Sequence, residues 1–315
     1  MRVLITGIKG FVGPYLADSL QHAGIECVGI SFAAPEFPHP ISLDGITVRE
    51  LDLRDRDATR SCVADLRPDS VVHLAAISSV PYSVKNPQLT FDVNVGGSVS
   101  LFDAVRHLDK PVRVLHVSSG NVYGNRDSGE TGFREDEIPN PVSPYAASKL
   151  AAEIAARSFV GDLGMEIVIA RPFNHTGPGQ PQSFVCPEFA RSIAEGLRRG
   201  ENPVLLRTGA LEPRRDFTDV RDVVEAYRLL LLRGRAGEVY NVSSGSLVSI
   251  AEIVALFQEA AGVAIRTETD PARLRIREVA RLAGDSSKIR SELAWKPKIS
   301  LPELLGDLLE YWKSI

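Results

Sequence analysis

The sequence predicts a doubly wound α/β fold, in which helices cover both faces of a parallel sheet, joined to a smaller, mostly C-terminal α/β cap. Three observations predict it. Short runs that are apolar at nearly every position alternate with amphipathic stretches through the first 170 residues, as in sheets buried on both faces. A glycine-rich turn follows the first of these runs directly. After residue 170 the texture changes to long segments rich in proline, glycine and asparagine.

The apolar runs place the strands, and the periodic stretches between them place the helices. Strand–helix alternation of this kind is typical of a parallel sheet built from crossover units. The expected strands are RVLITG (2–7), ECVGIS (26–31), ITVREL (46–51), SVVHLAA (70–76), VRVLHVSS (112–119), EIVIARP (166–172) and, returning later to the same sheet, EVYNVS (238–243). The expected helices are 11–24, 55–66, 87–108 and 144–163.

The second half of the chain predicts a smaller unit with its own helices. We expect the first domain to take residues 1–170 and about 217–243, and the cap to take 171–216 and 244–315. Segments 171–184 and 208–217 carry turn residues and are expected to be ordered loops. The remaining expected elements are a short strand at 203–207 and helices at 185–199, 220–232, 249–261 and 301–314.

Composition excludes several classes of function. A net charge of −4 without a cluster of Lys or Arg argues against nucleic acid as a partner. No apolar stretch reaches the ~20 residues that span a bilayer, and the first apolar run is too short for a signal peptide. Cys27, Cys62 and Cys186 are far apart and lack metal-ligand spacing, so we expect no metal site and a reducing, cytoplasmic setting.

The glycine turn has the spacing of a dinucleotide-binding loop. Gly7, Gly10 and Gly13 stand between the first strand and the first helix, with Phe11 and Val12 at the helix start. Glycine allows a tight turn and close approach of backbone to ligand, and a helix amino terminus favours an anion. The position after a strand and before a helix predicts a Rossmann-type cofactor site.

The second strand bears on the choice of cofactor. Where an NAD-selecting site carries a carboxylate for the ribose 2′-hydroxyl, this chain has Ser31. A small hydroxyl leaves room for a 2′-phosphate, so NADP(H) is favoured and NAD(H) remains possible. In LDLRD, Asp52 could meet the adenine amino group beside Leu53, or it could simply cap a helix.

A tyrosine and a lysine four residues apart open the alanine-rich helix SPYAASKLAAE. Tyr145 and Lys149 share one helix face, and an ammonium near a phenol lowers the pKa of the phenol toward neutrality. Such a phenol can donate or accept a proton. Ser119 ends a strand 26 residues earlier, where ligands bind in open α/β sheets. For an isolated pair, a half-buried Tyr beside a surface Lys would be the simpler interpretation.

Seven motifs in order resemble the extended short-chain dehydrogenase/reductases that act on nucleotide sugars: TGIKGFVG, HLAA, VSSGNVYG, SPYAASK, RPFNHTGPGQ, RRDFTDVRDVVEAY and YNVSSG. The resemblance implies that Ser119, Tyr145 and Lys149 are the catalytic trio, and that Asn94 orders the site. Tyr145 would pass the proton and Lys149 would hold the nicotinamide ribose. Further residues implied at the cofactor are Leu74, Ala75, Ala76 and Arg171.

The family contains dehydratases, epimerases and reductases. Its 4,6-dehydratases carry acidic residues after the strand-end hydroxyl, where this chain has Gly120 and Asn121. Segments after residue 170 are similar to the GDP-4-dehydro-6-deoxy-D-mannose reductases, which form GDP-D-rhamnose. The resemblance therefore implies NAD(P)H-dependent reduction of a 4-keto sugar. A UDP-glucose 4-epimerase is the alternative, ahead of a dehydratase or a non-catalytic cofactor sensor.

The resemblance also implies a binding site for a nucleotide sugar, with GDP favoured. Asn174, Arg215 and Arg275 would hold the diphosphate, although each arginine could instead form a surface ion pair. Val185 would lie near the base or in the core. The sugar would meet Ser79, Val80, Ser119, Gly120 and Asn121. His73 and His175 are expected to have packing roles, and a homodimer through helices 87–108 and 144–163 is usual in the family.

Overall fold

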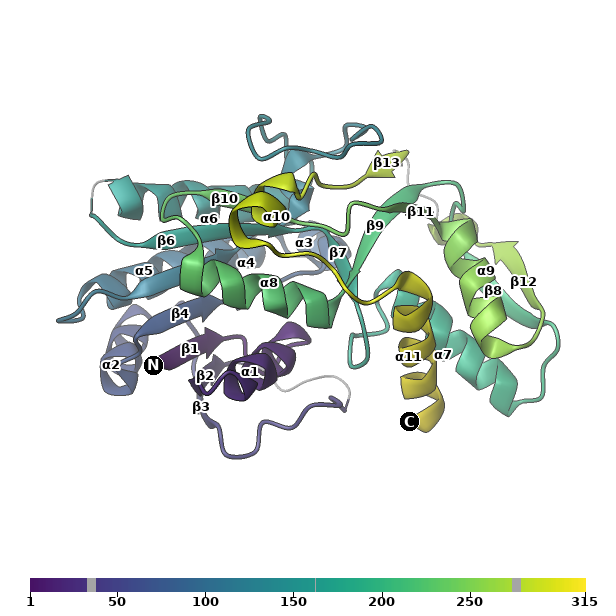
Figure 1. Ribbon diagram of the computed structural model, residues 1–315, viewed down its shortest axis with the longest axis horizontal. Coiled ribbons are helices and arrows are strands. Elements are labelled where there is room, and N and C mark those ends of the chain that lie inside the picture. The colour runs from purple at the N-terminus through teal and green to yellow at the C-terminus, as the bar shows by residue number, and fades with distance from the viewer. Residues whose placement is uncertain (33–37, 162, 274–278) are drawn as a thin grey trace.

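The chain forms two adjoining units (Figure 1). This computed structural model describes residues 1–32, 38–161, 163–273 and 279–315. The larger unit contains the N-terminus and is built on one sheet, while the helix that ends the chain belongs to the smaller unit. None of the helices within these described ranges is long and apolar enough to cross a bilayer.

The large sheet has seven strands, all parallel, in the order β10–β6–β5–β4–β1–β2–β3. The chain winds outward from β1 to β3 in one direction and from β4 to β6 in the other. The topological switch point, where such sheets bind ligands, therefore lies between β1 and β4. The strands are β1 (Arg2–Thr6), β2 (Glu26–Ser31), β3 (Thr47–Glu50), β4 (Ser70–His73), β5 (Arg113–Val117), β6 (Ile167–Pro172) and β10 (Val239–Val242).

Helices cover both faces of this sheet, as its doubly apolar strands require. Within β1, Val3 and Ile5 point into one core cluster and Leu4 into the other, because alternate residues face opposite sides. The first cluster packs under α1 (Val12–His22), α8 (Val220–Arg233) and α10 (Ser287–Leu293). The second packs under α2 (Arg56–Leu66), α5 (Gly97–Arg106) and α6 (Pro144–Gly161).

The smaller unit has its own core, formed by three helices against short strands. Its helices are α7 (Val185–Arg198), α9 (Ile250–Ala261) and α11 (Leu301–Ser314). One sheet contains β7 (Asn174–Thr176), β9 (Arg214–Asp219), β11 (Leu247–Ser249) and β13 (Arg281–Leu282), and another pairs β8 (Val204–Thr208) with β12 (Ile265–Thr269). The short elements are α3 (Val80–Lys85), α4 (Pro87–Phe91), η2 (Gly120–Tyr123) and η3 (Pro271–Arg273).

Two segments that the sequence predicts as loops contain strands that pair with each other. β7 and β9 run parallel, with Asn174 opposite Phe217. β9 was not predicted because its sequence is polar. Its Asp216 is nevertheless fully buried. Its carboxylate accepts hydrogen bonds from the Ser243 hydroxyl at 2.7 Å and from the backbone of residues 244–246. A strand whose charged residue is satisfied internally shows no apolar periodicity.

The predicted single helix at 87–108 is divided in the structure. A π-helical turn, η1 (Asp92–Gly96), separates α4 from α5. Asn94 lies in that turn, and its side chain bonds to both backbone groups of Ile77, at 2.7 and 3.1 Å. The side-chain amide thus ties the turn to the segment after β4, and π-turns of this kind often mark functional sites.

Some residues that the sequence assigns to the cap, within 244–315, pack in the larger unit. Ile289, Leu293 and Trp295 belong to the core under α1 and α8 rather than to the core of the smaller unit. The indole of Trp295 donates to the carbonyl of Asp222 on α8, at 3.0 Å. Part of segment 244–315 therefore returns to the large sheet before α11 completes the smaller unit.

Candidate active site

The glycine cradle, residues 7–13, joins β1 to α1 beside the switch point. Gly7 has φ +71°, and a Cβ there would lie 2.9 Å from the backbone of Ala75. At Gly13 a Cβ would come within 2.2 Å of the Ile8 carbonyl oxygen. Gly10 is exposed, and no side chain caps the amino end of α1, whose first turn also lacks an acid. The free amides of this turn are therefore available to an anion.

The residues predicted to flank the cradle surround it on two sides. Leu74 and Ala75 follow β4, and their amides bond to the Thr6 carbonyl and hydroxyl oxygens, at 3.2 and 3.3 Å. Leu53 lies in the core, while Ala76 is half-buried. Ser31 ends β2 and is buried. This geometry places a hydroxyl, rather than a carboxylate, at the end of the second strand.

Asp52 does not cap a helix. Asp55 caps α2 instead, by accepting from the Ala58 amide at 3.0 Å. Both oxygens of Asp52 accept from the Nε of Arg54, at 3.0 and 2.9 Å, and these hydrogen bonds lower the pKa of Asp52. The alternative role at the adenine remains a prediction.

A buried hydrogen-bond chain links the first strand to the helix that carries the predicted catalytic pair. His73 bonds to Thr6 Oγ1 at 2.7 Å and to Ser98 Oγ at 2.9 Å, and burial lowers its pKa to about 3, so the ring is neutral at pH 7. Ser98 donates to the carbonyl of Asn94, whose amide donates to Ser148 on α6 at 2.9 Å. Residues of three predicted motifs are thereby fixed relative to one another.

The structure brings together the trio that the resemblance implies. Ser119 follows β5, and Tyr145 and Lys149 lie on the first turns of α6; all three are less than 8% exposed. The Ser119 hydroxyl accepts from the Asn121 amide at 3.2 Å and also interacts with the Tyr145 phenol. The amide of Tyr145 donates to Ser83 at 3.2 Å, which fixes the start of the helix.

The predicted acidity of the phenol is wrong for this structure. Burial raises the pKa of Tyr145, and the hydrogen bond with Ser119 opposes that shift only in part. Burial also lowers the pKa of Lys149 to about 8, against the opposing charge of Glu153. At pH 7 the site therefore holds a protonated phenol beside a charged ammonium.

Arg171, implied at the cofactor, instead bonds to protein groups beneath the trio. Its guanidinium is 3% exposed; it donates to Glu153 Oε2 at 2.7 Å and to the Tyr123 hydroxyl at 2.9 Å. Its role at the cofactor stays a prediction. Sequence reasoning missed Glu153, although its position four residues after Lys149 places it on the same helix face.

The residues predicted at the sugar lie around Ser119 and α3. The hydroxyl of Ser79 caps α3 by accepting from Tyr82, at 3.3 Å, and Val80 begins that helix. Gly120 packs against the ring of Phe173, so a Cβ at Gly120 would meet three ring carbons at 2.9 Å. Asn121 is half-buried in η2. No side chain fits at position 120 while that ring stays in place.

The residues predicted at the diphosphate and the base are more dispersed. Asn174 donates to the Asp216 carbonyl at 3.2 Å, and Arg215 donates to the Val279 carbonyl at 2.8 Å. Val185 begins α7. Arg275 lies outside the described residues.

An aromatic contact that sequence reasoning missed connects the cofactor loop to the second unit. The rings of Phe11 and His175 are nearly parallel, 7° apart in plane and 6.1 Å apart between centroids. Phe11 belongs to the glycine cradle and His175 to β7. The predicted cofactor loop and the predicted substrate loop are therefore in direct contact.

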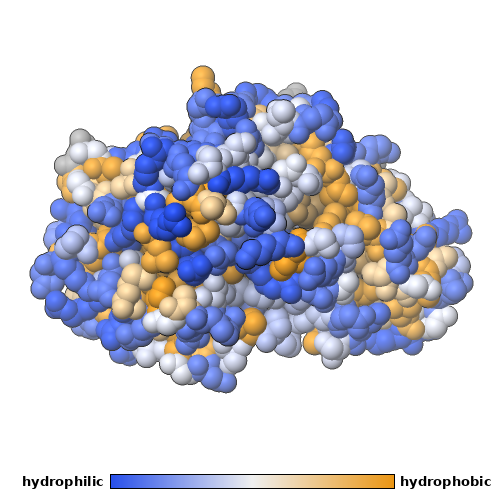
Figure 2. Space-filling view, in the orientation of Figure 1, coloured by the Kyte–Doolittle hydropathy of each residue, from blue (hydrophilic) through white to orange (hydrophobic). Residues whose placement is uncertain are grey.

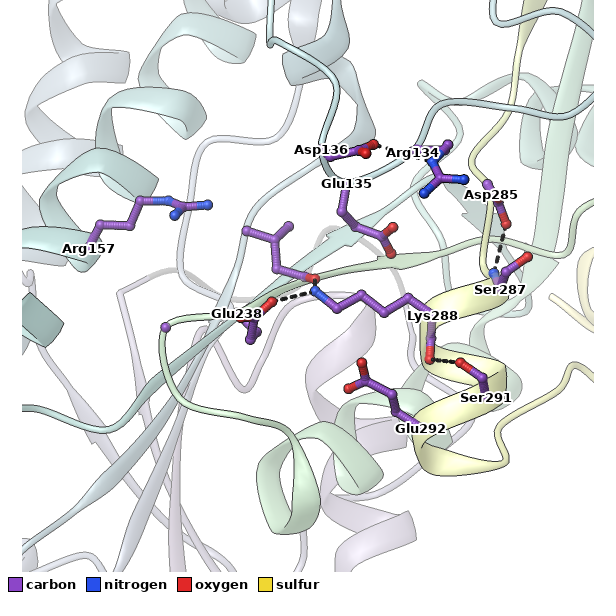
Figure 3. A pocket seen from close by; sticks show the side chains of 12 residues that line it. Arg134, Glu135, Asp136, Arg157, Glu238, Asp285, Ser287, Lys288, Ser291 and Glu292 are labelled. Atoms are coloured by element: carbon purple, nitrogen blue, oxygen red, sulfur yellow. Dashed lines mark hydrogen bonds and ion pairs between the residues drawn. The ribbon is translucent and has the colours of Figure 1, made fainter.

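A cavity of about 510 Å³ lies away from the trio, at the edge strand β10 (Figure 3). Lys288 reaches across it to Glu238 at 2.7 Å and to the Val239 carbonyl at 2.6 Å, while Arg157 approaches from α6. Glu135 accepts from the amide of Asn241 on the same strand, at 2.8 Å. These charges cap the free edge of the sheet and discourage pairing with another strand. The surrounding face is mostly hydrophilic, with hydrophobic side chains in separate patches (Figure 2).

Comparisons with known proteins agree with this architecture. The family profile described as GDP-mannose 4,6 dehydratase matches residues 4–308. The GDP-6-deoxy-D-mannose reductase of Pseudomonas aeruginosa is 36% identical over 313 residues, covering 99% of this chain and 97% of that protein. The UDP-glucose 4-epimerase of Mycolicibacterium smegmatis is 32% identical, with 100% and 99% covered. The solved structure of RMD from Pseudomonas aeruginosa complexed with NADPH has a TM-score of 0.86 at 34% identity, with 99% of each chain covered.

Proposed function

We propose that this chain, which belongs to the GDP-mannose 4,6-dehydratase family of extended short-chain dehydrogenases/reductases, is an NADPH-dependent nucleotide-sugar reductase. Its substrate would be the 4-keto group of a GDP-linked 6-deoxy sugar, GDP-4-dehydro-6-deoxy-D-mannose, and its product GDP-D-rhamnose. The buried trio of Ser119, Tyr145 and Lys149, in a chain whose glycine cradle fits a dinucleotide, is the observation that carries the proposal.

The glycine cradle fits a dinucleotide. The uncapped amino end of α1 offers free amides to the diphosphate, and Gly7 and Gly13 stand where any Cβ would strike backbone. When bound, NADPH supplies the hydride. Ser31, in place of an acid at the end of β2, leaves the ribose 2′ position free of repulsion toward a phosphate.

Tyr145 acts as the proton donor to the sugar oxygen as negative charge develops there. A raised pKa suits this direction of reaction, because the phenol must carry its proton at neutral pH. Lys149 then stabilises the phenolate that forms, and Ser119 orients the reacting oxygen.

The surroundings of Ser119 argue against dehydration as the reaction. Elimination of water from the sugar needs its own acid and base. Position 120 accepts no side chain beside Phe173, and the amide of Asn121 exchanges no proton at neutral pH. With no acid after Ser119, the trio remains suited to reduction.

The substrate contacts that we propose are those that the resemblance to the family implies. Ser79, Val80, Gly120 and Asn121 would line the sugar site. Asn174, Arg215 and Arg275 would hold the diphosphate, for which a guanidinium is the suited partner, and Val185 would lie near the base.

Incubation of the purified enzyme with NADPH and GDP-4-dehydro-6-deoxy-D-mannose tests the proposal. We expect one NADPH to be oxidised for each GDP-linked 6-deoxy sugar reduced at C4. The comparison reaction contains UDP-glucose and NAD, with no keto sugar. Interconversion of UDP-glucose and UDP-galactose, without NADPH consumption in the first reaction, would show an epimerase instead.

We also propose a cytoplasmic homodimer. The three cysteines are unpaired, as in a reducing compartment. Phe91, Val99 and Ile154 are exposed apolar side chains on α4, α5 and α6, and α6 contacts both of the other helices. Sedimentation equilibrium should give twice the mass of one chain, and Ile154→Arg should shift that mass toward the monomer. A monomeric wild type would contradict the dimer.

A further inference from the structure

Three side chains with polar functional groups lie in a row on the buried face of α6, and two of them belong to the trio. Tyr145, Lys149 and Glu153 are spaced four residues apart, so they share one side of the helix. Lys149 is 5% exposed and Glu153 only 1%. A carboxylate buried so deeply is rare unless a partner compensates its charge.

Arg171 provides that compensation with fixed geometry. Its Nε donates to Glu153 Oε1 at 3.0 Å, and its Nη2 donates to Oε2 at 2.7 Å, so the pair is bidentate. The Ser118 hydroxyl also donates to Glu153. On the far side, the guanidinium bonds to Tyr123, whose ring centroid lies 4.9 Å from Cζ, and Tyr123 donates to Asn241 at 2.9 Å. The carboxylate therefore cannot turn away from its place.

Among the residues that the structure describes, the other titratable groups found to interact with Lys149 carry no negative charge. His73 on β4 and His116 on β5 lie close enough to interact with the ammonium, and both are fully buried and neutral at pH 7. Tyr145 is protonated, as argued above. Burial depresses the pKa of Lys149, and Glu153 is the neighbouring charge that opposes the depression.

We propose that the Glu153–Arg171 pair is a positioning element of the reaction: Arg171 fixes the Glu153 carboxylate one helical turn behind Lys149, on the same buried face of α6, so that its negative charge acts on the buried ammonium. The inference rests on the proposed function, because the charge of Lys149 matters only if Tyr145 transfers a proton. Neither member of the pair touches the reacting atoms. They act through Lys149.

The variant Glu153→Gln/Arg171→Met tests the proposal, because it removes both charges together and leaves neither buried alone. Acetylation of Lys149 by acetic anhydride, followed by peptide mass spectrometry, reports the neutral amine in the enzyme without cofactor. In the wild type, the plot of the Lys149 acetylation rate against pH should have its midpoint near pH 8. In the double variant the midpoint should fall by about one pH unit. The alkaline limb of kcat/KM should move down equally.

Glu195→Gln is the matched control, since Glu195 pairs with Arg191 one turn apart on the exposed side of α7, at 2.8 Å. Its Lys149 midpoint should equal that of the wild type. An unchanged midpoint in the double variant overturns the proposal. If that variant does not fold, Glu153→Asp decides, because it withdraws the carboxylate by one methylene and must still lower the midpoint. Absence of NADPH oxidation would instead refute the proposed function, which the acetylation measurement does not require.

Discussion

Tyr145→Phe is expected to lower turnover of the 4-keto sugar by about 10²–10⁴-fold, the contribution typical of a general acid. The loss arises because phenylalanine has no proton to give when charge develops on the sugar oxygen. Binding of NADPH should stay nearly unchanged, since the cradle at Gly7, Gly10 and Gly13 lies on β1 and α1 rather than on α6. Single-turnover oxidation of NADPH and a fluorescence titration of the cofactor measure the two quantities separately.

Tyr82→Phe is the control for this substitution. Tyr82 lies on α3 and is 44% exposed, so it loses the same hydroxyl without disturbing the buried site. Its turnover should match that of the wild type. Equal turnover in Tyr145→Phe and wild type would remove Tyr145 from the mechanism, and a parallel loss of NADPH affinity would indicate a structural defect instead.

The sequence predicts the large sheet because its strands are apolar on both faces and the glycine turn fixes their direction. Most of the predicted helices and all seven strands occur where expected. β9 escaped prediction because Asp216 is buried within it and satisfied by backbone amides. The π-turn at Asn94 escaped because it depends on a contact with Ile77, which local patterns do not contain.

In the site, too, local patterns predict the features that depend on spacing along the chain, but they do not predict the features that depend on tertiary contacts. The spacing of Tyr145 and Lys149 predicts a shared helix face, which the structure contains. The sign of the phenol shift was not predictable, because it depends on how completely the fold buries the ring. The resemblance implies that Arg171 lies at the cofactor, yet in the structure Glu153 pairs with it from another element. Which charges pair is decided by tertiary packing.

Phe173 gives a physical reason for two glycines, Gly120 and Gly284. Its ring lies between them: a Cβ at Gly120 would come within 2.9 Å of the ring and one at Gly284 within 2.1 Å. The ring is 5% exposed and packs with Tyr123 and Phe133. Phe173→Ala should therefore lower the free energy of unfolding by about 3–5 kcal/mol, as for other large-to-small changes at buried aromatic residues.

A double-mutant cycle separates two effects of the Phe173 ring: its steric restriction of position 120 and its packing contribution to the core. Gly120→Ala alone should cost about 1–3 kcal/mol through overpacking. In the Phe173→Ala background the same change should cost almost nothing, because the new methyl group enters the space that the ring vacated. Chemical denaturation of the four proteins measures the cycle. Gly306→Ala is the control, since it lies on α11 with open space around its Cβ.

Equal costs of Gly120→Ala in both backgrounds would show that the ring does not restrict position 120. A coupled result would mean that the residue after Ser119 is held to glycine by a side chain outside the trio. An acid at that position would then require the loss of Phe173 as well as the gain of a carboxylate. Packing behind Ser119 would then be a barrier to elimination at position 120, in addition to the missing acid and base.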